Sequence, residues 1–219
     1  MCKQKVKLLY KGNELLHRDW RGQAFIYTGA FQTFIVPMGL YKMRCEVVAA
    51  RGQQGWSSGN TGWHYAPPGK GGKVDCVLSV TPGQILYIYV GYAGPDQTNF
   101  DCQTPKYNAS DIRTNNTGIL DTSSLQSRLI VAGGEGHDGA NGRFGLGGAA
   151  HVGFNVFPAG AGGAGWYGGG GGSGAWNKVG AFTSTGGGGS SYTHPTFCTN
   201  VEHTQGFNTG NGYITISMA

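Results

Sequence analysis

The sequence has little charge, no closely spaced cysteine pair and no long apolar run. Charged residues make up 12% of the 219 residues, where about 25% is typical of soluble domains. The five cysteines include no CxxC pair, which argues against a structural zinc site. No stretch approaches the 18 apolar residues of a membrane span, and the N-terminus lacks the apolar run of a signal peptide. We therefore expect no metal, no cofactor and no membrane insertion.

Glycine and aromatic residues are abundant instead. Glycine contributes 42 residues, and the chain also holds 10 Phe, 11 Tyr and 5 Trp. So much glycine often accompanies disorder, but an apolar fraction of 39% is enough to build a core. Most of the chain is therefore expected to be ordered.

The positive charge is concentrated at the N-terminus. Residues 1–21 hold six basic and two acidic side chains, a net +4 out of the total +5. A nucleic-acid-binding fold normally shows a basic face across its whole surface, so nucleic-acid binding is not expected. Residues 1–24 are predicted to form a basic arm or hairpin that turns at residues 11–14 and serves attachment or assembly. Residues 25–219 are predicted to form one module.

Short runs with a period of two predict β-strands and no helix. In residues 41–47, the side chains of Tyr41, Met43, Cys45 and Val47 are expected on one face of a strand. Further strands are predicted at residues 31–37, 74–80, 85–90, 128–132 and 210–217, with 85–90 covered on both faces. Cys45 and Cys76 are interpreted as small buried hydrophobes. The sequence leaves open whether Cys102 and Cys198 form a disulfide.

Residues 133–191 contain 24 of the 42 glycines. Such segments can form polyproline-II-type helices, and glycine allows several of them to pack side by side with hydrogen bonds between them. A bundle of polyglycine II helices is therefore predicted here. The alternative is a flexible linker, but linkers rarely carry aromatic residues such as Trp166, Tyr167, Trp176 and Phe182. The fold class is predicted to be all-β: a jelly-roll-like β-sandwich with an inserted polyglycine bundle and long glycine-rich loops.

The layout of the chain resembles a family of glycine-rich domains. Its parts are the opening strand at 31–37, Gly71-Gly72-Lys73-Val74, the run from Pro82 to Gly91, a strand followed by Gly133-Gly134, Gly186–Ser191 and a closing Gly212–Ile216. One branch comprises fibre and receptor-binding proteins of bacteriophages. The other is the glycine-rich ectodomain of anaplastic-lymphoma-kinase-type receptors. This chain has more β-strand before its glycine block than phage tail-tip adhesins have, and few cysteines compared with the receptors.

The resemblance implies a non-enzymatic protein of the virion surface, made in the host cytoplasm, that recognises or adheres to a host-cell receptor. It also implies contacts with other fibre proteins through the N-terminal arm, and assembly as a homotrimer. The alternatives are a ligand-binding or adhesion ectodomain at a cell surface, and a purely structural assembly protein. Glycan hydrolysis also stays open, although no paired carboxylates point to it.

The candidate contact residues are the large aromatic side chains in glycine-rich loops. They are Trp56, Trp63, Tyr65, Trp166, Tyr167 and Trp176. Exposed Trp and Tyr supply contact area at low entropic cost to a protein or glycan receptor, but they can equally pack back onto the fold. Glu135, His137 and Asp138 could bind a cation, yet in a loop they are more often solvated. The Gly134–Gly139 match to a dinucleotide motif lacks the helix that would hold a pyrophosphate.

Overall fold

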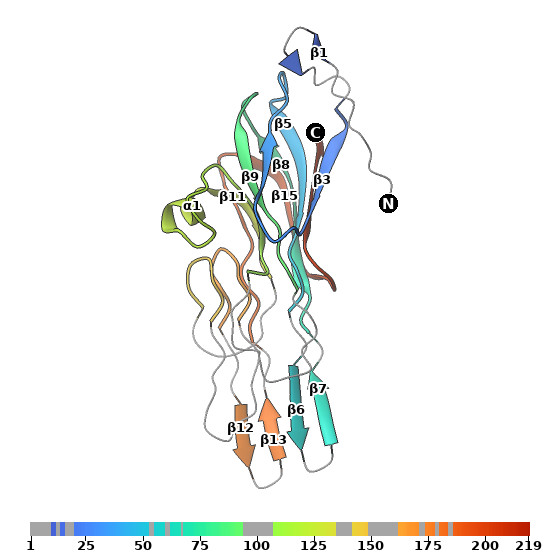
Figure 1. Ribbon diagram of the computed structural model, residues 1–219, viewed down its shortest axis with the longest axis vertical. Helices are drawn as coiled ribbons and strands as arrows, with labels where there is room; N and C mark the ends of the chain where they lie inside the picture. Colours follow the sequence, from blue (N-terminus) through green and yellow to red (C-terminus); the bar gives the residue numbers. More distant parts are fainter. Residues whose placement is uncertain are drawn as a thin grey trace.

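The structure is a computed structural model. It describes residues 10–11, 14–15, 20–52, 55–59, 62–66, 68–93, 107–134, 142–148, 162–170, 174–177, 180–183 and 186–219. The molecule is elongated (Figure 1). The strands that carry most of the core form its upper half, and two hairpins form the opposite end.

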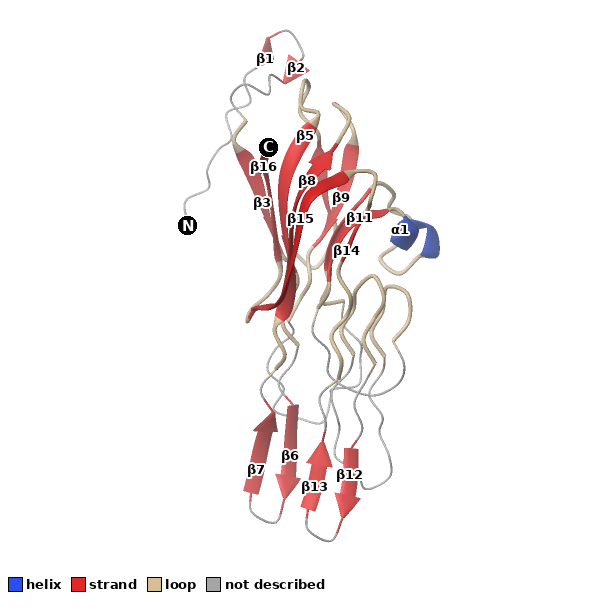
Figure 2. Cartoon of the chain, turned by 180° about the vertical axis from the view of Figure 1, so that it is seen from behind, coloured by secondary structure: helices blue, strands red, loops and turns tan. Residues whose placement is uncertain are grey.

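Two five-stranded antiparallel sheets pack face to face, as the all-β sandwich prediction requires. The first sheet has the order β15 (Cys198–Asn208), β8 (Gly71–Ser79), β5 (Lys42–Val48), β16 (Tyr213–Met218) and β3 (Gly22–Ile26). The second has the order β14 (Tyr192–Thr193), β11 (Arg128–Ala132), β10 (Ser110–Arg113), β9 (Ile85–Tyr89) and β4 (Gln32–Ile35). Figure 2 shows both sheets from behind.

The core between the sheets comes from the alternating residues of these strands. Met43, Cys45 and Val47 of β5 are completely buried, which confirms the predicted face. Tyr41 is 66% exposed and precedes the strand, so its assignment to that face was wrong. The remaining buried side chains of the core include Val74, Cys76, Leu78, Leu86, Ile88, Ile112, Ile130, Ile214 and Ile216. Each enters from a strand with a period of two.

Strand β9 is covered on both faces only along part of its length. Leu86, Ile88 and Tyr89 are buried, but Ile85 is 46% exposed, and so is its partner Ile35 on the edge strand β4, at 63%. Cys45, Cys76 and Cys198 are free thiols buried in the core. Cys102 lies outside the described residues.

One short helix, α1 (Thr122–Gln126), interrupts the strands, although none was predicted. Asp121 caps it by accepting hydrogen bonds from the backbone N–H groups of Ser123 and Ser124. A helix of five residues is too short to produce a visible period of 3.6, so its N-cap residue is its main sequence signal.

The N-terminal region contains a hairpin of β1 (Tyr10–Lys11) and β2 (Glu14–Leu15), which pair antiparallel. Strand β3 starts at Gly22 and pairs with β16, so residues 22–24 belong to the first sheet. The division of the chain into arm and module stays a prediction.

The end of the molecule farthest from this hairpin consists of two further hairpins, which we call the tip. They are β6 (Gly55–Gly59) with β7 (Gly62–Ala66), and β12 (Gly174–Asn177) with β13 (Gly180–Thr183). Strands β6 and β13 lie side by side (Figures 1 and 2). Glycine-rich segments connect the tip to the sandwich.

The glycine-rich segments 133–134, 142–148, 162–170 and 186–191 form what we call the stem. No helix is assigned to these described segments, and the predicted polyglycine helices are not seen as such. Their backbones are nevertheless joined by hydrogen bonds: Gly134 N–H donates to Ala164 O at 2.9 Å, and Gly189 N–H donates to Gly134 O at 2.8 Å. Gly163 N–H donates to Gly187 O at 3.0 Å, and Gly169 N–H to Gly163 O at 2.9 Å. Gly134 thus bonds to two other segments of the stem.

Candidate functional site

Four of the six predicted contact residues lie on the tip. Trp56 is in β6, Trp63 and Tyr65 are in β7, and Trp176 is in β12. The placement of their side chains lies outside what the structure describes. The backbone register pairs Trp56 with Tyr65 and Ser58 with Trp63. Because paired residues share a face, these three aromatic residues occupy positions on one face of the hairpin.

The other two predicted residues lie near the sandwich. Trp166 stacks on Tyr192 of β14 with ring centroids 3.7 Å apart, and meets Phe144 edge-on at 5.0 Å. The guanidinium of Arg128 lies 4.9 Å from the Trp166 ring and donates to Gly165 O. Trp166 therefore packs the stem onto β11 and β14. Tyr167 is 59% exposed beside Phe144.

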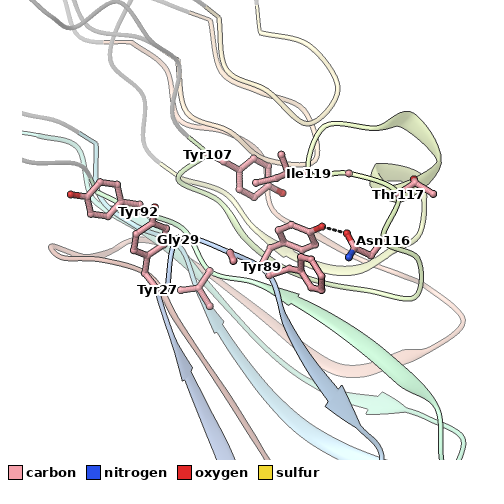
Figure 3. Close-up of a pocket in the computed structure, with 12 residues that line it drawn as sticks. Tyr27, Gly29, Tyr89, Tyr92, Tyr107, Asn116, Thr117 and Ile119 are labelled. Atoms are coloured by element: carbon pink, nitrogen blue, oxygen red, sulfur yellow. Dashed lines mark hydrogen bonds between the residues drawn. The ribbon is translucent and has the colours of Figure 1, made fainter.

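A pocket that sequence reasoning missed lies where the sandwich meets the stem (Figure 3). Its volume is about 710 Å³, within the usual range of small-molecule sites. We call it the waist pocket. Its lining consists of Tyr27, Gly29, Ala30, Phe31, Tyr89, Val90, Tyr92, Tyr107, Asn116, Thr117, Gly118 and Ile119.

Three separate segments carry the aromatic side chains of the waist pocket, and the loop at residues 116–119 completes its lining. Tyr27 and Phe31 come from the connection between β3 and β4, Tyr89 ends β9, and Tyr92 follows it. Tyr27 and Tyr92 stack with centroids 4.5 Å apart and planes 13° apart. Phe31 lies 6.1 Å from Tyr89. Tyr89 donates a short hydrogen bond to Asn116 Oδ1, which ties the loop at 114–120 to β9.

A buried ion pair supports this wall from beneath. Asp111 and Arg113 of β10 are completely buried, with Arg113 Nε 2.5 Å from Asp111 Oδ1. Arg113 also donates to Ile119 O at 3.0 Å and to Ser124 Oγ at 2.9 Å, so it anchors the segment that lines the pocket. Its guanidinium lies 3.9 Å from the centre of the Tyr89 ring.

The phenol of Tyr107 completes this network. It donates to Asp111 Oδ2 and accepts from Arg113 Nη2 at 2.9 Å. Burial, followed by the negative charge of Asp111, raises the pKa of Tyr107 above its usual value. Burial likewise raises the pKa of Tyr89. Both phenols are therefore neutral at physiological pH, and the pocket lining carries no charge.

Sequence reasoning missed this pocket because its residues lie at the ends of strands rather than in the glycine-rich loops. The one available signal was the tyrosine-rich strand from Ile85 to Tyr89, whose Tyr87 and Tyr89 alternate with core residues.

The candidate cation ligands Glu135, His137 and Asp138 lie outside the described residues. In the part of the chain that the structure describes, no group of three or more His, Cys, Asp or Glu side chains could hold a metal ion.

No model of a known protein family matches the chain, and no curated protein matches it. Among the described residues, no helix has the length and apolar character needed to cross a membrane.

Proposed function

We propose that this chain is a non-enzymatic recognition module of a virion fibre, and that it binds a host-cell receptor through its tip. The observation that carries this proposal is the meeting of hairpins β6–β7 and β12–β13 at the end of the molecule opposite to hairpin β1–β2 (Figure 1). Two segments far apart in the sequence thus share one terminal surface.

The topology supports a recognition role for this surface. The first hairpin is inserted between β5 and β8, and the second between β11 and β14; each of these strand pairs is hydrogen-bonded in the sandwich. Both insertions therefore leave a fixed scaffold and return to it. Long excursions from a rigid scaffold are where proteins most often place binding residues.

The tip residues have the composition of an interface. Trp56, Trp63 and Tyr65 share one face of their hairpin by register, and Trp176 lies in the neighbouring hairpin. Trp and Tyr dominate binding energy at interfaces because they bury large areas with few rotatable bonds.

We further propose that the stem is a bundle of polyglycine II helices that holds the tip away from the sandwich. Two observations support this proposal. Backbone hydrogen bonds join the segments of the stem, and the backbones approach one another closely. A Cβ built on Gly147 would lie 1.6 Å from Gly162 O, and one on Gly162 would lie 1.8 Å from Gly169 O. Only glycine permits such contacts, as at the collagen axis.

The opposite end of the molecule suits attachment. Hairpin β1–β2 and the C-terminus lie there (Figure 1). Residues 1–21, which include this hairpin, carry a net charge of +4. An arm at this end would dock onto other fibre proteins while the tip faces outward. A homotrimer is the assembly that the analogy with fibres suggests.

Binding of the labelled protein to intact bacterial cells tests the proposal. The variant Trp63→Ala/Trp176→Ala should lose saturable binding while keeping its melting temperature. Tyr41→Ala is the matched control, since Tyr41 is exposed and precedes β5 at the end away from the tip, and it should bind like the parent. Undiminished binding by the folded tip variant would refute recognition through the tip. Absence of binding to any host would favour a purely structural role.

A further inference from the structure

The waist pocket is uncharged throughout. Its twelve lining residues include no Asp, Glu, Lys, Arg or His. The nearest buried charges, Asp111 and Arg113, neutralise one another. Because transferring an unpaired ion into such an apolar site is costly, the ligand that fits it is electrically neutral.

The walls of the pocket are aromatic. Tyr27 and Tyr92 form a stacked pair with planes 13° apart, and Phe31 and Tyr89 stand 6.1 Å apart (Figure 3). The face of an aromatic ring carries partial negative charge and attracts the slightly positive C–H groups of a ligand. A sugar ring offers such a C–H face. Tyr27, Phe31 and Ile119 are partly exposed, so a ligand can reach them.

Polar groups surround the apolar walls. Asn116 carries an amide donor group, and Tyr27 and Tyr92 carry hydroxyl groups, while the Thr117 hydroxyl is already bonded to Asp121 and Ser123. An aromatic peptide side chain would bring at most one polar atom to this site. A sugar ring carries hydroxyl groups around its whole edge, which matches polar groups spread over several segments.

We propose that the waist pocket binds the ring of a neutral saccharide, with the C–H face of the sugar against the outer face of the stacked Tyr27–Tyr92 pair and its hydroxyl groups toward the Asn116 amide. A volume of about 710 Å³ has room for a short oligosaccharide. This site is separate from the tip and does not rest on recognition there.

Isothermal titration calorimetry of the full chain tests this proposal with four neutral probes: lactose, maltotriose, cellotriose and chitotriose. At least one should bind with a dissociation constant of about 1 mM or lower. Tyr27→Ala should weaken that binding at least ~10-fold, while Tyr27→Phe, which keeps the ring, should retain most of it. Tyr41→Ala, outside the pocket, should bind like the parent. Circular dichroism and melting curves establish that each variant is folded.

Three results would overturn the proposal. They are failure of all four probes to bind, unchanged binding in folded Tyr27→Ala, and tighter binding of N-acetyl-tyrosinamide or of the anionic sialyllactose than of every neutral probe. The tip variant Trp63→Ala/Trp176→Ala should bind saccharide like the parent even when it loses cell binding. A result that refutes saccharide binding in the waist pocket can therefore be distinguished from one that refutes receptor binding by the tip.

Discussion

The sandwich and the stem are ordered by opposite means. In the sandwich, backbone groups pair along ladders and the space between the sheets is filled by side chains such as Met43, Ile88 and Ile130. In the stem, backbone lies directly against backbone, and a Cβ built on Gly169 would lie 1.9 Å from Gly187 O. The sandwich depends on which side chains are present, and the stem depends on their absence.

Glycine can therefore stabilise a fold in spite of its entropic cost. Each glycine loses more backbone freedom on ordering than any other residue. The stem offsets that loss with backbone hydrogen bonds between its segments and with dispersion contacts that a larger residue would prevent. A small apolar cluster also joins the regions, with Ala109 and Val131 of the sandwich and Ala164 of the stem.

The largest expected effect comes from the charge that the sandwich buries. Arg113→Leu leaves Asp111 without its counter-ion in a fully buried position, which should cost about 3–5 kcal/mol of unfolding free energy. Urea denaturation measures it. The double variant Asp111→Leu/Arg113→Leu should recover much of the loss, since a buried ion pair is often replaceable by apolar residues. Equal losses in the single and double variants would contradict this explanation.

A slightly smaller effect is expected in the stem. Gly169→Ala places a methyl group where Gly187 O now lies, and should cost about 3 kcal/mol because the segments must separate. The adjacent Gly170→Ala is the matched control, since a Cβ there meets no atom within 4 Å. It should change stability by less than about 1 kcal/mol. Denaturant titration of both variants compares them, and similar losses would show that backbone contact is not what requires glycine at position 169.

The smallest expected effect is on the pH dependence of the loop that lines the waist pocket. Hydrogen bonds from the Ser123 and Thr117 hydroxyls and the backbone N–H of Ser124 lower the pKa of Asp121 to about 2. A depressed pKa means that the ionised form favours the folded loop. This contribution is fully present above the unfolded pKa of about 3.9 and is lost as pH falls through about 2. A carbon NMR titration of the Asp121 carboxyl should give that low midpoint, whereas an ordinary midpoint would contradict the capping role.

The sequence predicted the strands whose side chains alternate between core and solvent. Residues 42–48, 71–79 and 213–218 are examples, with bounds close to those predicted. Strand β15 was missed because it is a sheet edge with mostly exposed side chains and two register shifts. Strand β10 was missed because its Asp111 and Arg113 are buried as a pair, which makes a buried strand look polar.

Neither candidate site could be fully predicted, for different reasons. The tip aromatics Trp56, Trp63 and Trp176 were recognised by residue type, but their convergence depends on the pairing of β5 with β8 and of β11 with β14. The waist pocket combines four segments between Tyr27 and Ile119. No local pattern in any one of them indicates that the others lie nearby.

Amide hydrogen exchange by NMR measures whether backbone hydrogen bonds hold the stem together. The amides of Gly134, Gly148, Gly163 and Gly189 donate to carbonyls of other stem segments and should exchange slowly. Gly29 and Gly39, in exposed loops of the sandwich, should exchange rapidly. Strong protection of the four stem amides is the predicted result. Exchange as fast as that of Gly29 and Gly39 would contradict a stem ordered by its backbone.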